Sequence, residues 1–74
     1  MDKSKVVYVQ ISKELKKARV ARHMTQETLA AASGVPAAYI GFIEAGHRRP
    51  TVSTICKLTS ALGISLEKHI FKGL

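Results

Sequence analysis

Apolar and lysine residues alternate with the period of a helix from residue 11 to about residue 23. The apolar residues Ile11, Leu15 and Ala18 fall on one face, and Lys13, Lys16 and Lys17 fall on another. The lysine face is typical of a helix surface in contact with solvent. The pattern therefore predicts a first helix that begins at Ile11 and ends near His23.

The residues before this helix follow a different pattern. Residues 1–5 are mostly polar, whereas residues 6–9 are a short run of β-branched and aromatic side chains, VVYV. Such side chains favour extended backbone, so we expect an N-terminal arm or short strand at residues 1–10. The domain is then expected at residues 11–74, because a chain of 74 residues supports only one small core.

Residues 25–50 predict two helices joined by a tight turn. Thr25 supplies a capping oxygen at the start of a run of good helix formers, and Gly34 supplies the positive φ that ends a helix. Pro36 is suited to the start of the next helix, which Gly46 is expected to end. The apolar residues whose spacing brings them together across the two helices are Leu29, Ala30, Val35, Ile40 and Ile43.

A further helix is predicted at residues 51–62, with Thr51 or Ser53 as its cap and Gly63 as its end. Its expected buried residues are Val52, Ile55, Leu58 and Leu62. Cys56 lies between apolar neighbours on this helix, and we expect its thiol to be buried or half-buried.

Residues beyond Gly63 are expected to form a last short helix that starts at Ser65. The apolar residues Phe71 and Leu74 exceed what one small core needs. They are interpreted either as an exposed seam for a partner subunit or as a frayed apolar tail.

The chain from Ile11 to Ile70 resembles the phage-repressor and Cro-like helix-turn-helix family. The residues that carry the resemblance are Arg19, Thr25, Gln26, Leu29, Ala30, Gly34, Val35, Ile40, Ile43, Glu44, Gly46, Pro50, Leu58, Ala61, Leu62, Gly63 and Leu66. The resemblance implies an all-α fold, a compact five-helix domain with a central helix-turn-helix. It also implies a Cro/C1-type transcriptional regulator that places its third helix, about residues 36–45, in the DNA major groove. Such proteins bind two-fold symmetric sites as homodimers.

The resemblance also gives roles to single residues. It sets Arg19 opposite Glu44 as a structural ion pair, and an arginine fork matches a carboxylate through two hydrogen bonds. We therefore expect both residues to be scaffold rather than DNA ligands. It places Gln26 against a DNA phosphate, whereas the residue by itself favours an exposed glutamine at a helix start.

The third predicted helix departs from the family at the positions that read bases. Ala37, Ala38, Gly41 and Phe42 replace the polar residues of the family, and none of the four can form a bidentate hydrogen bond to a base edge. Alanine and phenylalanine side chains can pack on a thymine methyl group, and Tyr39 retains one hydroxyl for a phosphate or a base. We therefore expect this helix to recognise the DNA sequence only weakly.

Charge points to nucleic acid as the partner. Twelve Lys and Arg against five Asp and Glu give a net charge of +7 and a pI near 10, which favours a polyanion. The loop His47, Arg48 and Arg49 follows the third predicted helix and is expected to contact backbone phosphates. An anionic membrane is the less favoured partner. Membrane binding needs a helix with one apolar and one basic face, and most apolar residues here have the spacing of core residues.

Other function classes find no support in the sequence. The three histidines are far apart, with no cysteine or carboxylate at metal-ligand spacing, so no metal or other cofactor is expected. No nucleophile stands beside a base, so an enzyme is not expected. A single cysteine cannot form an internal disulfide, which favours a reducing compartment. The apolar run at residues 6–9 is too short for a signal peptide or a membrane span, so we expect the protein in the cytoplasm.

Two functions remain open. The first is a DNA-binding transcriptional regulator of the repressor type. The second is a module of the same fold that binds another protein through the apolar face formed by Ala37, Ala38, Gly41 and Phe42, or through Phe71.

Overall fold

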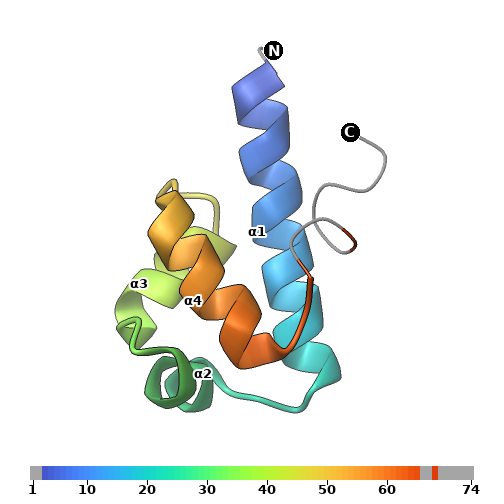
Figure 1. Cartoon of the computed structure of the whole chain (residues 1–74). Coiled ribbons are helices and arrows are strands. Elements are labelled where there is room, and N and C mark those ends of the chain that lie inside the picture. The colour runs from blue at the N-terminus through green and yellow to red at the C-terminus, as the bar shows by residue number, and fades with distance from the viewer. Residues whose placement is uncertain (1–2, 66–67, 69–74) are drawn as a thin grey trace.

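The computed structural model describes residues 3–65 and residue 68, and within them the chain is all-helical with no strand. The helices are α1 (Lys3–Ala21), α2 (Gln26–Ser33), α3 (Ala37–Glu44) and α4 (Val52–Leu62) (Figure 1). The described residues thus contain four helices, and the expected count of five is not confirmed. Of the expected last helix, the structure describes only Ser65 and Lys68, and the Lys68 N–H donates to Ser65 Oγ at 3.3 Å, as at a helix start. The predictions for Phe71 and Leu74 lie outside the described residues.

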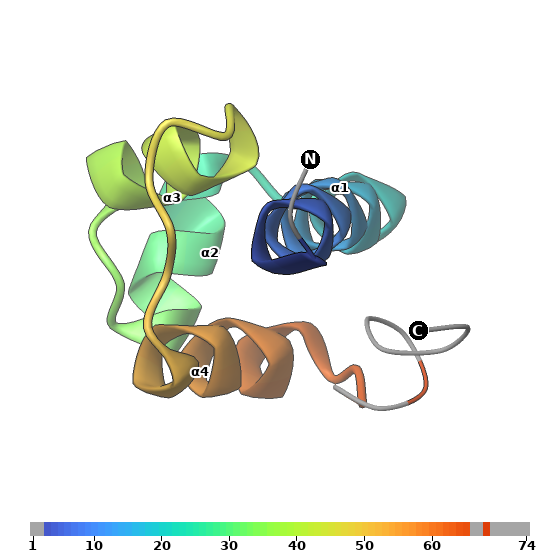
Figure 2. The same ribbon diagram turned by 90° about the horizontal axis from the view of Figure 1, so that it is seen from above.

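One apolar core joins the four helices. Helix α2 contacts both α3 and α4, and α1 packs against the same two helices (Figure 2). The buried core residues are Ile11, Leu15, Leu29, Val35, Ile40, Ile43, Ile55, Leu58, Leu62 and Ile64. The set contains four of the five residues predicted to meet between the second and third helices, and the fifth, Ala30, packs half-buried against it. The predicted helical pattern of this region is confirmed.

Helix α1 begins earlier than the sequence predicts. Residues 3–10 continue the helix instead of forming an arm or strand. Val7 and Tyr8 pack against the core, and the Ser12 hydroxyl donates to the Tyr8 carbonyl at 2.9 Å. Burial of these side chains outweighs the weak preference of valine and tyrosine for strands.

The turns occur at the predicted residues. Thr25 caps α2 by accepting the Thr28 N–H at 2.9 Å, and Gly34 ends α2 with φ +77°. The third helix ends in a Schellman motif, in which the Gly46 N–H donates to Ile43 O and the His47 N–H donates to Phe42 O. Gly46 has φ +79° there, so the residue that turns the chain from α3 towards the basic loop is the predicted one.

Two burial predictions for α4 are wrong. Val52 is 71% exposed, because it is the first residue of α4 and lies at the edge of the core. Cys56 is also exposed. It follows Ile55 by one residue, which rotates its side chain about 100° away from the buried face. Thr51, not Ser53, caps the helix by accepting the Thr54 N–H at 3.1 Å.

None of the helices in the described residues has the length and hydropathy needed to cross a bilayer.

Candidate nucleic-acid interface

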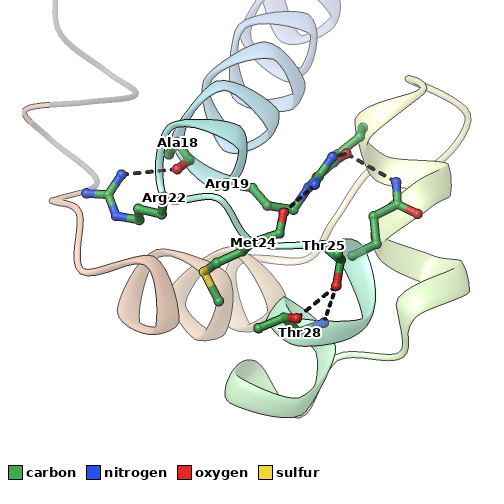
Figure 3. Close-up of polar contacts among 8 residues, drawn as sticks. Ala18, Arg19, Arg22, Met24, Thr25 and Thr28 are labelled. Carbon is green, nitrogen blue, oxygen red and sulfur yellow. Dashed lines mark hydrogen bonds and ion pairs between the residues drawn. The ribbon is translucent and has the colours of Figure 1, made fainter.

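Arg19 connects α1 with the loop before α2 and with the end of α3. Its Nε donates to Glu44 Oε2 at 2.7 Å and its Nη2 donates to Glu44 Oε1 at 2.9 Å, while Nη1 donates to the Met24 carbonyl at 2.7 Å (Figure 3). The two charged side chains are largely buried, with 12% of Arg19 and 4% of Glu44 exposed. The hydrogen bonds with Glu44 raise the pKa of Arg19, against an opposing effect of burial. The predicted structural ion pair is therefore present, and it ties α1 to the end of α3.

Gln26 joins this junction from the first turn of α2. Its Nε2 donates to Glu44 Oε1 at 3.2 Å. A Cβ atom added at Gly41 would lie 3.3 Å from Gln26 Oε1, so the glycine in the middle of α3 lets the glutamine side chain pass close to the helix. Glycine is suited to such a position because it has no side chain to block a close approach. Gln26 as a phosphate ligand stays a prediction.

The outward surface of α3 is apolar. Ala38 is exposed and Phe42 is 49% exposed, whereas Ala37, Tyr39 and Gly41 are half-buried. Tyr39 packs partly against the core. The two exposed residues are one helical turn apart, so they form a short apolar ridge without a hydrogen-bonding side chain.

The basic loop lies beside this ridge. His47, Arg48 and Arg49 are all exposed. The Arg48 guanidinium lies over the Phe42 ring at 5.9 Å from its centroid, and the Arg49 guanidinium lies over the Tyr8 ring at 5.2 Å. Such cation–π contacts hold the arginines near the protein surface. One surface hollow is lined by both arginines and by residues of α3 and its flanks, which are Pro36, Ala38, Tyr39, Phe42 and His47.

A family model described as helix-turn-helix matches residues 15–69. The chain belongs to the helix-turn-helix family. The match includes α2, α3, the basic loop and α4, and it begins within α1, so residues 3–14 precede it.

Two known proteins resemble the chain within this family. The first is an uncharacterized HTH-type transcriptional regulator, y4dJ, of Sinorhizobium fredii, which is 45% identical over 42 residues. That match covers 57% of this chain and 54% of the relative, so the similarity spans about half of the relative's length. The second is the restriction-modification controller protein C.AhdI from Aeromonas hydrophila. Its crystal structure matches with a TM-score of 0.74 and 38% identity, over 78% of this chain and 88% of that one.

The residues predicted for the site divide into two groups. Around one hollow the structure brings together Ala38, Tyr39 and Phe42 of α3 and the loop residues 47–49, whereas Ala37 does not line it. Arg19, Gln26 and Glu44 form a separate hydrogen-bonded junction. Tyr8, whose ring lies beneath Arg49, was not among the predicted site residues. The signal was present in the helical spacing of Tyr8, Ile11 and Leu15, but residues 6–9 were interpreted as an arm.

The described residues contain no group of three or more His, Cys, Asp or Glu side chains that could hold a metal ion.

Proposed function

We propose that the chain is a DNA-binding transcriptional regulator of the repressor type and that α3 lies in the DNA major groove. The observation that carries this proposal is the position of the exposed α3 ridge beside Arg48 and Arg49, within the part of the chain that matches the helix-turn-helix family. A cationic loop next to a protruding helix suits a duplex, because the major groove admits the helix while phosphates border the groove on both sides. The net charge of +7 adds a long-range attraction.

The individual contacts follow from the surface. The residues that face base edges are Ala37, Ala38, Tyr39 and Phe42. Direct recognition of the base sequence comes from apolar contact with thymine methyl groups. The phosphate contacts come from Gln26 and from the His47, Arg48 and Arg49 loop. With so few hydrogen-bonding side chains on α3, selectivity depends mainly on DNA shape and on the spacing of two half-sites bound by a homodimer. We place this regulator in the cytoplasm, and its task is regulatory rather than catalytic.

Titration with a short duplex at two salt concentrations tests the proposal. We expect saturable binding that weakens steeply as salt rises, because phosphate contacts release counterions. The same titration with a duplex of unrelated sequence measures the specific part of the affinity. Absence of duplex binding at low salt contradicts the proposal.

The exposure of Phe42 favours a second candidate, a module that binds another protein through the α3 ridge. A half-exposed phenylalanine on an apolar ridge is typical of an interface anchor. In that case Phe42→Ala leaves duplex affinity unchanged and removes the protein partner. For a DNA-binding regulator the same substitution lowers duplex affinity, so one variant separates the two candidates.

A further inference from the structure

A cationic cleft lies between the N-terminal half of α1 and the loop that follows α3. Its volume is about 290 Å³. The lining residues from α1 are Lys5, Tyr8, Val9, Ser12 and Lys13, and those from the end of α3 and the loop are Glu44, Ala45, Gly46, Arg48 and Arg49. The cleft exists because α1 extends to Lys3, beyond the start expected from the sequence.

Positive charge dominates this cleft. Four cationic side chains line it, Lys5, Lys13, Arg48 and Arg49, against the single carboxylate of Glu44. Glu44 is 4% exposed and is already neutralised by the two hydrogen bonds from Arg19. The charge that the cleft presents to solvent is therefore cationic, and it suits an anion.

The chemistry of the lining favours a phosphate group. A guanidinium over an aromatic ring keeps N–H donors at its edge, as Arg49 can above Tyr8. Lysine side chains add strongly hydrated point charges. Ser12 is buried, and its hydroxyl donates to the Tyr8 carbonyl, so the charge for an anion comes from the lysines and arginines. A water molecule takes about 30 Å³ in the liquid, so the cleft has room for a phosphate group with part of its hydration shell.

We infer that this cleft binds a phosphate of the DNA backbone beside the major groove entered by α3. The inference rests on the proposed function, because Arg48 and Arg49 line both this cleft and the hollow on the α3 surface. The residues that α1 contributes all precede residue 15, where the family match begins. They give this chain a phosphate position that the matched helix-turn-helix segment alone does not contain.

Two double variants of α1 test the cleft. Lys5→Gln with Lys13→Gln removes two charges that line it, and Lys16→Gln with Lys17→Gln removes two exposed charges of the same helix that do not. Glutamine retains helix propensity, and circular dichroism confirms that both variants fold. We expect the first pair to lower the slope of log affinity against log salt by about one unit, and the second pair to change it much less. Equal effects of the two pairs, or no effect of the first, overturn the inference.

A titration with inorganic phosphate separates this inference from the proposed function. Amide resonances of Tyr8, Ser12 and Gly46 should shift saturably with phosphate at constant ionic strength, and the shifts should be lost in the Lys5→Gln, Lys13→Gln variant. Phosphate shifts together with salt-dependent duplex binding support the DNA assignment. If phosphate shifts these amide resonances but the protein binds no duplex, both the proposed function and the DNA backbone as the source of the phosphate are contradicted. The cleft is then a site for a free anion. Duplex binding without phosphate shifts, and with equal salt slopes for the two variants, overturns the cleft alone.

Discussion

Arg19 donates hydrogen bonds to both carboxylate oxygens of Glu44, at 2.7 and 2.9 Å, across 25 positions of sequence. Because Glu44 is 4% exposed, removal of the guanidinium leaves a carboxylate largely buried and poorly paired. Breaking such a pair is more costly than the net contribution of the pair itself.

Arg19→Ala should therefore destabilise the fold by about 3 kcal/mol. Thermal melting followed by circular dichroism measures this change. Arg22→Ala is the matched control, because Arg22 is exposed and its side chain donates only to the carbonyl of Ala18 among its described contacts. Its effect should stay within about 0.5 kcal/mol. An unchanged melting temperature for Arg19→Ala with lost duplex affinity would make Arg19 a DNA ligand.

Arg48→Ala and Arg49→Ala should weaken binding to all duplexes alike. Each lost phosphate contact lowers the salt slope by about one unit, while the preference between two duplex sequences stays the same. Fluorescence anisotropy over a series of salt concentrations provides both quantities. Lys57→Ala, at an exposed position of α4 outside both hollows, is the control for net charge. A changed sequence preference would show that the arginine reaches a base edge.

Phe42→Ala should reduce affinity most for duplexes with thymine at one position, because the ring packs on a methyl group. Replacing that thymine by uracil removes only the methyl group, so the parent protein should lose the same affinity on the uracil duplex. The Phe42→Ala variant should then bind the thymine and uracil duplexes equally. If the parent already binds the two equally, Phe42 contacts no thymine methyl group.

Gly41→Ala should have little net effect on stability in the parent protein. Alanine gains about 1 kcal/mol in helix propensity over glycine, but its Cβ would lie 3.3 Å from Gln26 Oε1 and displace the amide from Glu44. The lost hydrogen bond costs about 1 kcal/mol. In a Gln26→Ala background the full helix gain should appear. A double-mutant cycle by urea unfolding measures the coupling, and additive effects would contradict the contact.

His23→Gly should stabilise the chain by roughly 0.5–1 kcal/mol, after the greater flexibility of glycine in the unfolded state is subtracted. His23 has φ +55° and occupies the left-handed position after α1, where its N–H donates to Val20 O and the Met24 N–H donates to Arg19 O. Urea unfolding measures the gain, and His23→Ala should not produce it. A loss of stability in the glycine variant would show that the histidine side chain has a structural role.

The local signals in the sequence predict the centre of the fold well. Thr25, Gly34 and Gly46 act as caps and turns through their own backbone and side-chain chemistry, so their roles can be predicted from the residue and its neighbours. The partnership of Arg19 and Glu44 was available only through the family resemblance, since no local pattern connects residues 25 positions apart.

Features that depend on tertiary contact could not be predicted in the same way. Residues 3–10 form a helix because Val7 and Tyr8 find a core to pack against. The run VVYV taken by itself favours extended backbone, and only the helical spacing of Tyr8 with Ile11 and Leu15 points to that core. Val52 matches the spacing of a buried residue, but the helix starts there and its side chain lies beyond the packed region. The path of the Gln26 amide past Gly41 likewise exists only in the folded chain.

The Glu44 carboxylate, which accepts hydrogen bonds from both Arg19 and Gln26, has a consequence for the kinetics and thermodynamics of association. Any tilt of α3 relative to α1 or α2 would break a charged hydrogen bond in a poorly solvated place. The orientational entropy of α3 is therefore lost when the chain folds. No further loss of this entropy occurs when the chain binds its target. The domain should dock as a rigid body, with a preorganised α3 and a small entropic penalty for ordering its backbone.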